Sequence, residues 1–312
     1  MANSLLSAPH FHNEEAAFEY VESKLWPNGP TCPHCGECDR IGRLNGKSTR
    51  VGLCKCYSCR KPFTVRMGTV FESSHLPLKL WLQVIHLMCA SKKGVSSRQI
   101  QRMLQCSMKT AWFLSHRIRE AMTANDLEPF GSMGGAVEVD ETYFGTKPGV
   151  DVESGHPNHK HAIMTLVDRD SGRAYSQVIT KFNFNTASDL MSVAMSAKAR
   201  LNTDQHQVYK GIGRWFASHA TVNHSAEEYA RYEGKHMITT NTVEGFFSVF
   251  KHGMTGIYQH CSEAHLHRYL AEFDFRYSNR AKMGVDDTAR ASRVITGAVG
   301  KRLTYETIGQ RA

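Results

Sequence analysis

The chain has no apolar run close to the roughly 20 residues that cross a membrane. Its polar start, residues 1–16, has no basic head followed by an apolar core, which excludes an ordinary secretion signal. It also has no internal repeat and no low-complexity segment. We therefore expect a soluble, cytoplasmic protein that does not act in a membrane.

Acidic residues are fewer than basic ones. The sequence has 29 Asp and Glu and 38 Lys and Arg, which gives a formal charge of +9 and a pI near 9.1. This excess favours an acidic partner such as nucleic acid or an anionic membrane, and charge alone does not choose between them. A length of 312 residues allows one sizeable core with one or two small modules.

The nine cysteines are an odd number and fit poorly with a disulfide framework. Two CxxC pairs, 32–35 and 56–59, instead present paired thiolates on tight turns, which is typical of a zinc ribbon. Cys38 and Cys54 lie nearby, so an exchange of ligands stays open, as does the alternative of incidental thiols. The spacing predicts a structural Zn²⁺ held by Cys32, Cys35, Cys56 and Cys59.

Helical patterns flank the ribbon. Residues 13–26 predict a short amphipathic helix, and residues 78–90 predict a core helix because they are apolar nearly all round. Beyond them, residues 96–104, a short turn and residues 107–122 resemble a DNA-reading helix-turn-helix. An ordinary helical hairpin is the alternative. The basic residues of the second predicted helix are Lys109, Arg117 and Arg119.

The second half of the chain predicts strands before helices. The expected strands are 137–144, 161–167 and 173–180, followed by a helix at 185–200, an acid at Asp204, and helices at 241–254 and 262–277. This is the element order of a ribonuclease H-like α/β core, in which acids from separate elements converge on divalent metal.

Two acids stand out by position. Asp140 ends an apolar, β-branched run, where a strand leaves the core and a carboxylate can face both a metal ion and a substrate. Glu244 and Lys251 lie two helical turns apart and project from the same side of one helix. Residues 241–244 also read as a capping box, in which Glu244 only caps the helix.

Several motifs together resemble the transposases of the IS1595 insertion-sequence family, the ISXO2-like group. They are VDETYFG at 139–145, TD at 203–204, NTVEGFFSVFKHGMTGIY at 241–258, and the zinc ribbon with GTVFESSHLPLKLW at 68–81. The resemblance covers most of residues 15–280. It implies an enzyme of the DDE type that cuts DNA at transposon ends and joins the freed strands to target DNA.

Carried onto matching positions, the resemblance implies a catalytic triad of Asp140, Asp204 and Glu244, with Lys251 as the basic residue behind it. The triad would hold Mg²⁺ or Mn²⁺, which would activate water and then the freed 3′ hydroxyl. Residues 195–202 make a poor strand, so Asp168 and Asp189 stay open as substitutes for Asp204. Asn241 is the rival of Glu244, because the family is described as using asparagine there as well.

We expect four segments: a short helix plus zinc ribbon (1–72), a helix-turn-helix DNA-binding segment (73–126), a ribonuclease H-like DDE catalytic domain (136–280) and a basic C-terminal tail (281–312). The expected partner is double-stranded DNA, both transposon ends and target, bound by a homodimer or larger oligomer. The competing hypotheses are a DNA-binding regulator with an inactive core and a junction resolvase, which cuts without joining. The histidines of 252–267 fit no strong metal motif.

Overall fold

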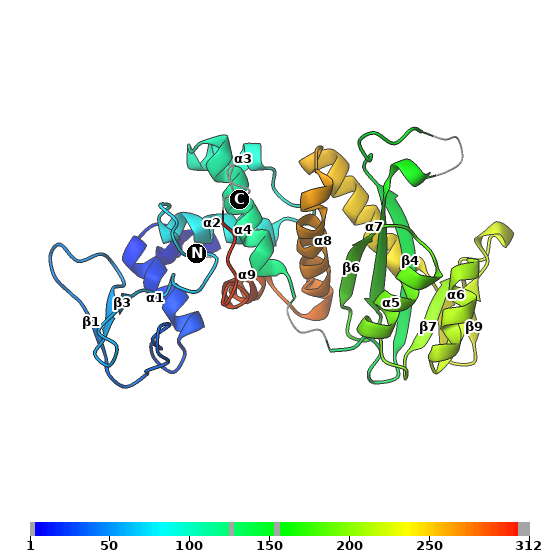
Figure 1. The fold of residues 1–312 in the computed structure, drawn as a ribbon, viewed down its shortest axis with the longest axis horizontal. Helices are drawn as coiled ribbons and strands as arrows, with labels where there is room; N and C mark the ends of the chain where they lie inside the picture. Colours follow the sequence, from blue (N-terminus) through cyan, green and yellow to red (C-terminus); the bar gives the residue numbers. More distant parts are fainter. Residues whose placement is uncertain (1–3, 125–127, 153–156, 305–312) are drawn as a thin grey trace. The chain divides into compact units, whose positions relative to one another are not determined.

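A computed structural model describes residues 4–124, 128–152 and 157–304 (Figure 1). The chain forms two compact units, one of Met1–Thr123 with Asp286–Ala312, and one of Ala124–Val285. We call them unit 1 and unit 2. Within the described ranges, no helix is both long and apolar enough to cross a membrane.

Unit 1 combines helices with a small sheet. Its described α-helices are α1 (Glu14–Leu25), α2 (Leu78–Ala90), α3 (Ser97–Leu104), α4 (Met108–Met122) and α9 (Asp287–Thr296). Helix α2 buries residues on most of its circumference, including Trp81, Ile85 and Met88, as its apolar sequence predicts. Ser96 and Ser107 accept hydrogen bonds from the first turns of α3 and α4, so each helix begins at a capping serine.

The end of the chain is not simply a basic tail. Helix α9 contacts α1, α2 and α4, and it buries Ala291, Val294 and Ile295. The contacts of the chain therefore return residues 286–304 to unit 1, whereas the sequence suggested a separate segment at 281–312. Residues 1–3, 125–127, 153–156 and 305–312, which the four expected segments include, lie outside the described residues.

Unit 2 is built on a five-stranded sheet with the order β6-β5-β4-β7-β8. Strand β4 pairs antiparallel with β5 and parallel with β7, while β5–β6 is antiparallel and β7–β8 parallel. The strands are β4 (Ala136–Phe144), β5 (His161–Asp168), β6 (Ala174–Ile179), β7 (Arg200–Asp204) and β8 (Ser218–Val222), with a hairpin of β9 (Ala230–Glu233) and β10 (His236–Thr239).

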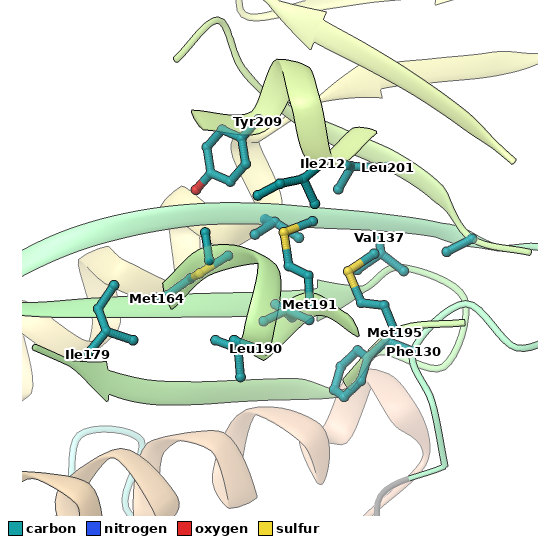
Figure 2. Close-up of a cluster of buried hydrophobic side chains, with 14 of the residues drawn as sticks. Phe130, Val137, Met164, Ile179, Leu190, Met191, Met195, Leu201, Tyr209 and Ile212 are labelled. Carbon is teal, nitrogen blue, oxygen red and sulfur yellow. The ribbon is translucent and has the colours of Figure 1, made fainter. Parts of the chain in front are cut away.

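Both faces of the sheet are covered. Helices α5 (Phe184–Ala194) and α6 (Gln207–Ile212) pack on one face, in the apolar cluster drawn in Figure 2. Helices α7 (Asn241–Gly253) and α8 (Glu263–Ser278) pack on the other, with a π-helical turn at Met254–Tyr258 between them. Side chains alternate along a strand, so Val137 and Val139 face α5 and α6, while Glu138 and Asp140 face α7.

The structure departs from the expected elements in the middle of unit 2. The helix expected at 185–200 ends at Ala194, and the strand that carries Asp204 begins only at Arg200. Strands β8, β9 and β10 were not expected. Their side chains are mostly exposed or partly buried, so the sequence shows no clear alternation of apolar and polar residues.

Candidate active site

Asp140 and Asp204 end up level with each other in unit 2. The parallel register pairs Glu138 with Asn202, and two residues further along it aligns Asp140 with Asp204. Strand β4 lies at the point where the sheet changes from antiparallel to parallel pairing. Ligand sites in α/β sheets are commonly found at such switch points, beyond the carboxyl ends of parallel strands.

Glu244 reaches this region because α7 begins beside β4. The buried Glu138 carboxylate accepts hydrogen bonds from the backbone N–H groups of Thr242 (2.7 Å) and Val243 (3.0 Å). The positive end of the helix dipole also stabilises a negative charge at this position. Glu138 and Asp140 share one face of β4, so the same strand holds the first turn of α7 and carries the first acid.

The capping box suggested by the sequence is replaced by another arrangement. Glu244 accepts a hydrogen bond from the Thr240 hydroxyl (2.7 Å) and lies 3.2 Å from Nε2 of His224. The Glu244 side chain remains 40% exposed, so one of its oxygens stays accessible for a ligand. Asn241, the rival at this position, is exposed at the start of α7.

Four acids of this region, Asp140, Glu141, Asp204 and Glu244, lie close enough to interact electrostatically. Burial, then the neighbouring Glu141 carboxylate, then Asp204 and Glu244 raise the pKa of Asp140 to about 8. Burial also raises the pKa of Glu141 to about 7, with a further contribution from Asp204 and an opposing one from its hydrogen bond with Tyr209. The charges of Asp204 and Glu244, which contribute to the raised pKa of Asp140, also favour binding of a cation there.

These carboxylates fit hard divalent cations in their chemistry, because Mg²⁺ and Mn²⁺ prefer oxygen ligands. In the described part of the chain, however, only cysteines form a group of three or more His, Cys, Asp or Glu ligand atoms within 4.8 Å of one another. The acids of unit 2 are thus more widely spaced than the ligands of a closed single-ion site. A site that holds two ions with room for phosphate needs such spacing.

The substitutes for Asp204 lie elsewhere. Asp168 pairs with Val137 at the opposite end of β4, and its carboxylate accepts hydrogen bonds from the backbone N–H groups of Gly131, Asp170 and Ser171. These bonds hold a turn. Asp189 is exposed on α5, on the other face of the sheet from α7. Only Asp204 among these three acids therefore aligns with Asp140.

Two of the residues that shape the site, Glu138 and Tyr209, were not expected from the sequence. Tyr209 on α6 is fully buried, and its hydroxyl donates a hydrogen bond to Oε2 of Glu141 (2.9 Å). A glutamate in the middle of an apolar strand was the only signal for Glu138.

Lys251 is exposed on α7, two turns beyond Glu244, as the spacing predicts.

Unit 1 contains a second metal-compatible group. The sulfur atoms of Cys32, Cys35, Cys56 and Cys59 all lie within 4.8 Å of one another. A three-stranded sheet of β1 (Ile41–Arg43), β2 (Cys54–Cys56) and β3 (Pro62–Phe63) supports them. Four clustered thiolates are compatible with a structural Zn²⁺ ion. Cys38 instead contacts Thr31 and the Gly36 carbonyl, and Cys54 is not part of the group.

The α3–α4 pair does not present the expected row of basic side chains. Lys109 is exposed, but Arg117 and Arg119 are only 5% and 0% exposed. The Arg117 guanidinium donates a hydrogen bond to the Glu72 carbonyl and lies 5.2 Å from the Trp81 ring centroid. Both arginines therefore belong to the interior of unit 1, and of the three basic residues Lys109 is the exposed one.

An α/β domain with acids on two adjacent parallel strands and a helix, in one chain with a four-cysteine cluster of the zinc-ribbon kind, defines a two-module protein. The comparisons name both modules. Residues 12–62 match the transposase zinc-ribbon domain of the IS1595 family, and residues 132–278 match the ISXO2-like transposase domain of the same family. The chain belongs to the IS1595 family of insertion-sequence transposases.

The single proteins that resemble this chain share little of its sequence. The "uncharacterized protein in transposable element ISH50" of Halobacterium salinarum is 29% identical over 133 residues, which are 43% of this chain and 42% of that protein. The chain thus matches less than half the length of this relative. A solved structure titled "CryoEM structure of simian T-cell lymphotropic virus intasome in complex with PP2A regulatory subunit B56 gamma" aligns with 62% of this chain and 65% of that chain, at 12% identity and a TM-score of 0.30.

Proposed function

We propose that the protein is a DDE-type transposase, which cleaves DNA at the ends of its insertion sequence and joins them to target DNA. The observation that carries this proposal is the alignment of Asp140 with Asp204 on adjacent parallel strands, with Glu244 close enough to raise the pKa of Asp140. The sheet order, with three antiparallel strands followed by two parallel ones, supports a ribonuclease H-like core.

In this proposal Asp140, Asp204 and Glu244 hold Mg²⁺ or Mn²⁺. Such ions, when bound, supply a metal-activated nucleophile and stabilise the charge that develops on the phosphate. The partly exposed Glu244 and Asp140, in the middle of β4, offer carboxylate oxygens. Because the pKa of Asp140 is about 8, its carboxyl group releases a proton when a cation arrives near neutral pH.

Two phosphoryl transfers follow from this chemistry. In the first, water attacks a phosphate at the transposon end, the phosphorus bond to the 3′ oxygen breaks, and that oxygen leaves as a hydroxyl. In the second, this 3′ hydroxyl attacks a phosphate of the target, and the target's own 3′ oxygen leaves. Lys251 would neutralise charge on the attacked phosphate from its exposed position on α7.

DNA contacts would come mainly from unit 1. Exposed basic side chains surround the cysteine cluster, and Lys109 opens α4. Such cations bind phosphates with little dependence on sequence. The exposed members of this basic set are Arg40, Arg43, Lys47, Arg50, Arg60, Lys61 and Lys109. Pairing of two DNA ends would require a homodimer or larger oligomer.

The test uses labelled duplexes that carry the ends of the insertion sequence, with Mg²⁺ or Mn²⁺. The wild-type protein should nick these ends and form joined products. Asp140→Asn should reduce cutting to the uncatalysed level and leave DNA binding intact, whereas Asp189→Asn, a matched change on the exposed face of α5, should cut normally. Binding without any metal-dependent cutting would identify a DNA-binding regulator, and cutting without joining a nuclease or junction resolvase.

A further inference from the structure

Strands β4 and β7 separate just before their acids. Their paired residues are Ala136 with Arg200, Val137 with Leu201 and Glu138 with Asn202, and the pairing ends there. Both strands continue with their outer neighbours, β4 with β5 as far as Phe144 and β7 with β8 as far as Asp204. At the level of Asp140 and Asp204, no backbone hydrogen bonds of this ladder fix the distance between the two strands.

A side-chain hydrogen bond links β4 to helix α6, which follows β7 in the chain. The Tyr209 hydroxyl donates to Oε2 of Glu141 over 2.9 Å, and the tyrosine ring is fully buried in the apolar cluster on that face of the sheet. Figure 2 shows the hydroxyl oxygen of Tyr209 directed away from Ile212 and Leu201, at the margin of the cluster. A buried ring gives the hydroxyl a fixed position, because the ring has little room to move.

Each end of this hydrogen bond is tied closely to one of the acids. Glu141 follows Asp140 directly in β4 and points to the opposite face. On the other side, Asp204 accepts a hydrogen bond from the backbone N–H of His206 (2.9 Å), and the Tyr209 N–H donates to the His206 carbonyl (3.1 Å). A short, hydrogen-bonded segment therefore connects the Asp204 carboxylate to the Tyr209 ring.

We propose that Tyr209 and Glu141 are positioning residues, whose hydrogen bond sets the spacing of Asp140 and Asp204 where β4 and β7 have no backbone pairing. This inference rests on the proposed function, since it concerns the same divalent-ion site. Glu141 acts here as a hydrogen-bond acceptor beneath the site, on the face of the sheet away from α7, and it is not itself a ligand of the ion.

The chemistry of the two side chains separates this role from the alternatives. Tyr209→Phe keeps the buried ring and removes only the donor. Glu141→Gln keeps an acceptor oxygen for the tyrosine and removes the charge that a metal ligand would need. Tyr175→Phe is the matched control, because Tyr175 packs against the same cluster and its hydroxyl donates a hydrogen bond to the nearby Gln177, away from the acids.

The experiment measures Mn²⁺ binding to the full-length variants by calorimetry without DNA, and then the Mn²⁺ concentration that half-saturates cleavage. Tyr209→Phe should weaken both by about tenfold, which corresponds to about 1.4 kcal/mol. Glu141→Gln should stay within about threefold of the wild type, and Tyr175→Phe should not differ from it. The melting temperature of the metal-free protein serves to exclude general unfolding.

Unchanged Mn²⁺ binding in Tyr209→Phe would overturn the proposal. It would also be overturned if Glu141→Gln lost binding as completely as Asp140→Asn, because Glu141 would then be a ligand. Since ion binding is measured without DNA, a wild-type protein that binds Mn²⁺ in this pattern but cuts nothing would refute the proposed function alone.

Discussion

The cysteine cluster of unit 1 and the acidic site of unit 2 differ in how their ligands are held. The cysteines come from two tight turns near one small sheet, and their sulfur atoms lie within 4.8 Å of one another. The acids come from β4, β7 and α7. The Glu138 carboxylate of β4 binds the first turn of α7, and Tyr209 of α6 donates a hydrogen bond to Glu141 of β4. A closed site suits a structural ion, while an open one leaves positions for substrate.

This comparison predicts opposite responses to loss of metal. The ribbon has a very small core of its own, so its fold should depend on Zn²⁺. Unit 2 has two apolar clusters, one on each face of its sheet, and should keep its fold without a divalent ion.

The largest expected effect is therefore in the ribbon. Cys35→Ser should remove Zn²⁺ and unfold residues 32–63, since structural zinc contributes on the order of 10 kcal/mol in small zinc modules. Cys38→Ser, which alters a thiol outside the group, is the matched control. Hydrogen exchange should show loss of amide protection in 32–63 and none in 161–168. Protection that persists in Cys35→Ser would show that the ribbon folds without its fourth ligand.

The second prediction concerns the link between β4 and α7. Glu138→Ala leaves the buried N–H groups of Thr242 and Val243 and the nearby Arg169 without their acceptor. The free energy of unfolding of unit 2 should fall by about 3 to 5 kcal/mol, and cleavage should fall with it because Glu244 loses its position. Urea unfolding measures the first effect.

Glu138→Gln is the conservative counterpart. It keeps one acceptor for the helix terminus and should cost about 1 to 2 kcal/mol. If Glu138→Ala were as stable and as active as the wild type, the first turn of α7 would not depend on β4. The acidic site would then not need hydrogen bonds from other residues to hold its elements, and this difference from the cysteine cluster would not exist.

The third prediction tests whether the scaffold of unit 2 responds to pH. Asp274 on α8 is buried and accepts hydrogen bonds from Ser176 N (2.8 Å) and Oγ (2.7 Å), which cover the edge of β6. Burial raises its pKa from 3.8 to about 7. The folded state thus binds this proton more tightly than the unfolded state, so the contribution of Asp274 to stability is fully present below pH 4 and declines as the pH rises through about 7.

Asp274→Asn should remove this decline, which is of the order of 2 to 4 kcal/mol. Urea unfolding at several pH values between 4 and 8 compares the slopes of the two proteins. Equal slopes would mean that Asp274 titrates alike in the folded and unfolded states. In both proteins the unfolding of unit 2 should not respond to chelators in this window, in contrast to the unfolding of the ribbon.

The smallest expected effect is at Lys251. Lys251→Ala should lower cleavage by about tenfold and change stability by less than about 0.5 kcal/mol, because the side chain is exposed. Lys198→Ala removes an exposed charge at the opposite end of β7 and is the control. Assays at rising salt should reduce the difference between these variants if Lys251 acts through its charge.

The sequence predicted the ligands of one site better than those of the other for a physical reason. CxxC turns are local, so the spacing already selects Cys32, Cys35, Cys56 and Cys59, and the structure clusters these four. Asp140 was identifiable because it follows an apolar, β-branched run, although β4 continues past it to Phe144. Asp204 was less clear, since β7 is only five residues long and begins after a non-strand segment.

Other features of the structure were missed because they depend on contacts between residues far apart in the chain, which the spacing of residues in the sequence does not reveal. Tyr209 was recognised only as part of an amphipathic stretch, because nothing in the sequence pairs it with Glu141. Arg117 and Arg119 were expected to face DNA on charge alone, and α9 was read as tail on its basic composition. In α9 the apolar positions 291, 294 and 295 do have helical spacing, so a signal was present there.

The central claim is that Asp140, Asp204 and Glu244 bind divalent ions together. Anomalous diffraction from crystals soaked in Mn²⁺ tests it most directly. We expect a manganese peak between Asp140 and Asp204, within ligand distance of Glu244 when DNA is bound, and no such peak in crystals of Asp140→Asn. Manganese that binds at Asp168 or Asp189 instead, or a site that stays empty in the wild-type protein with DNA, would contradict the account.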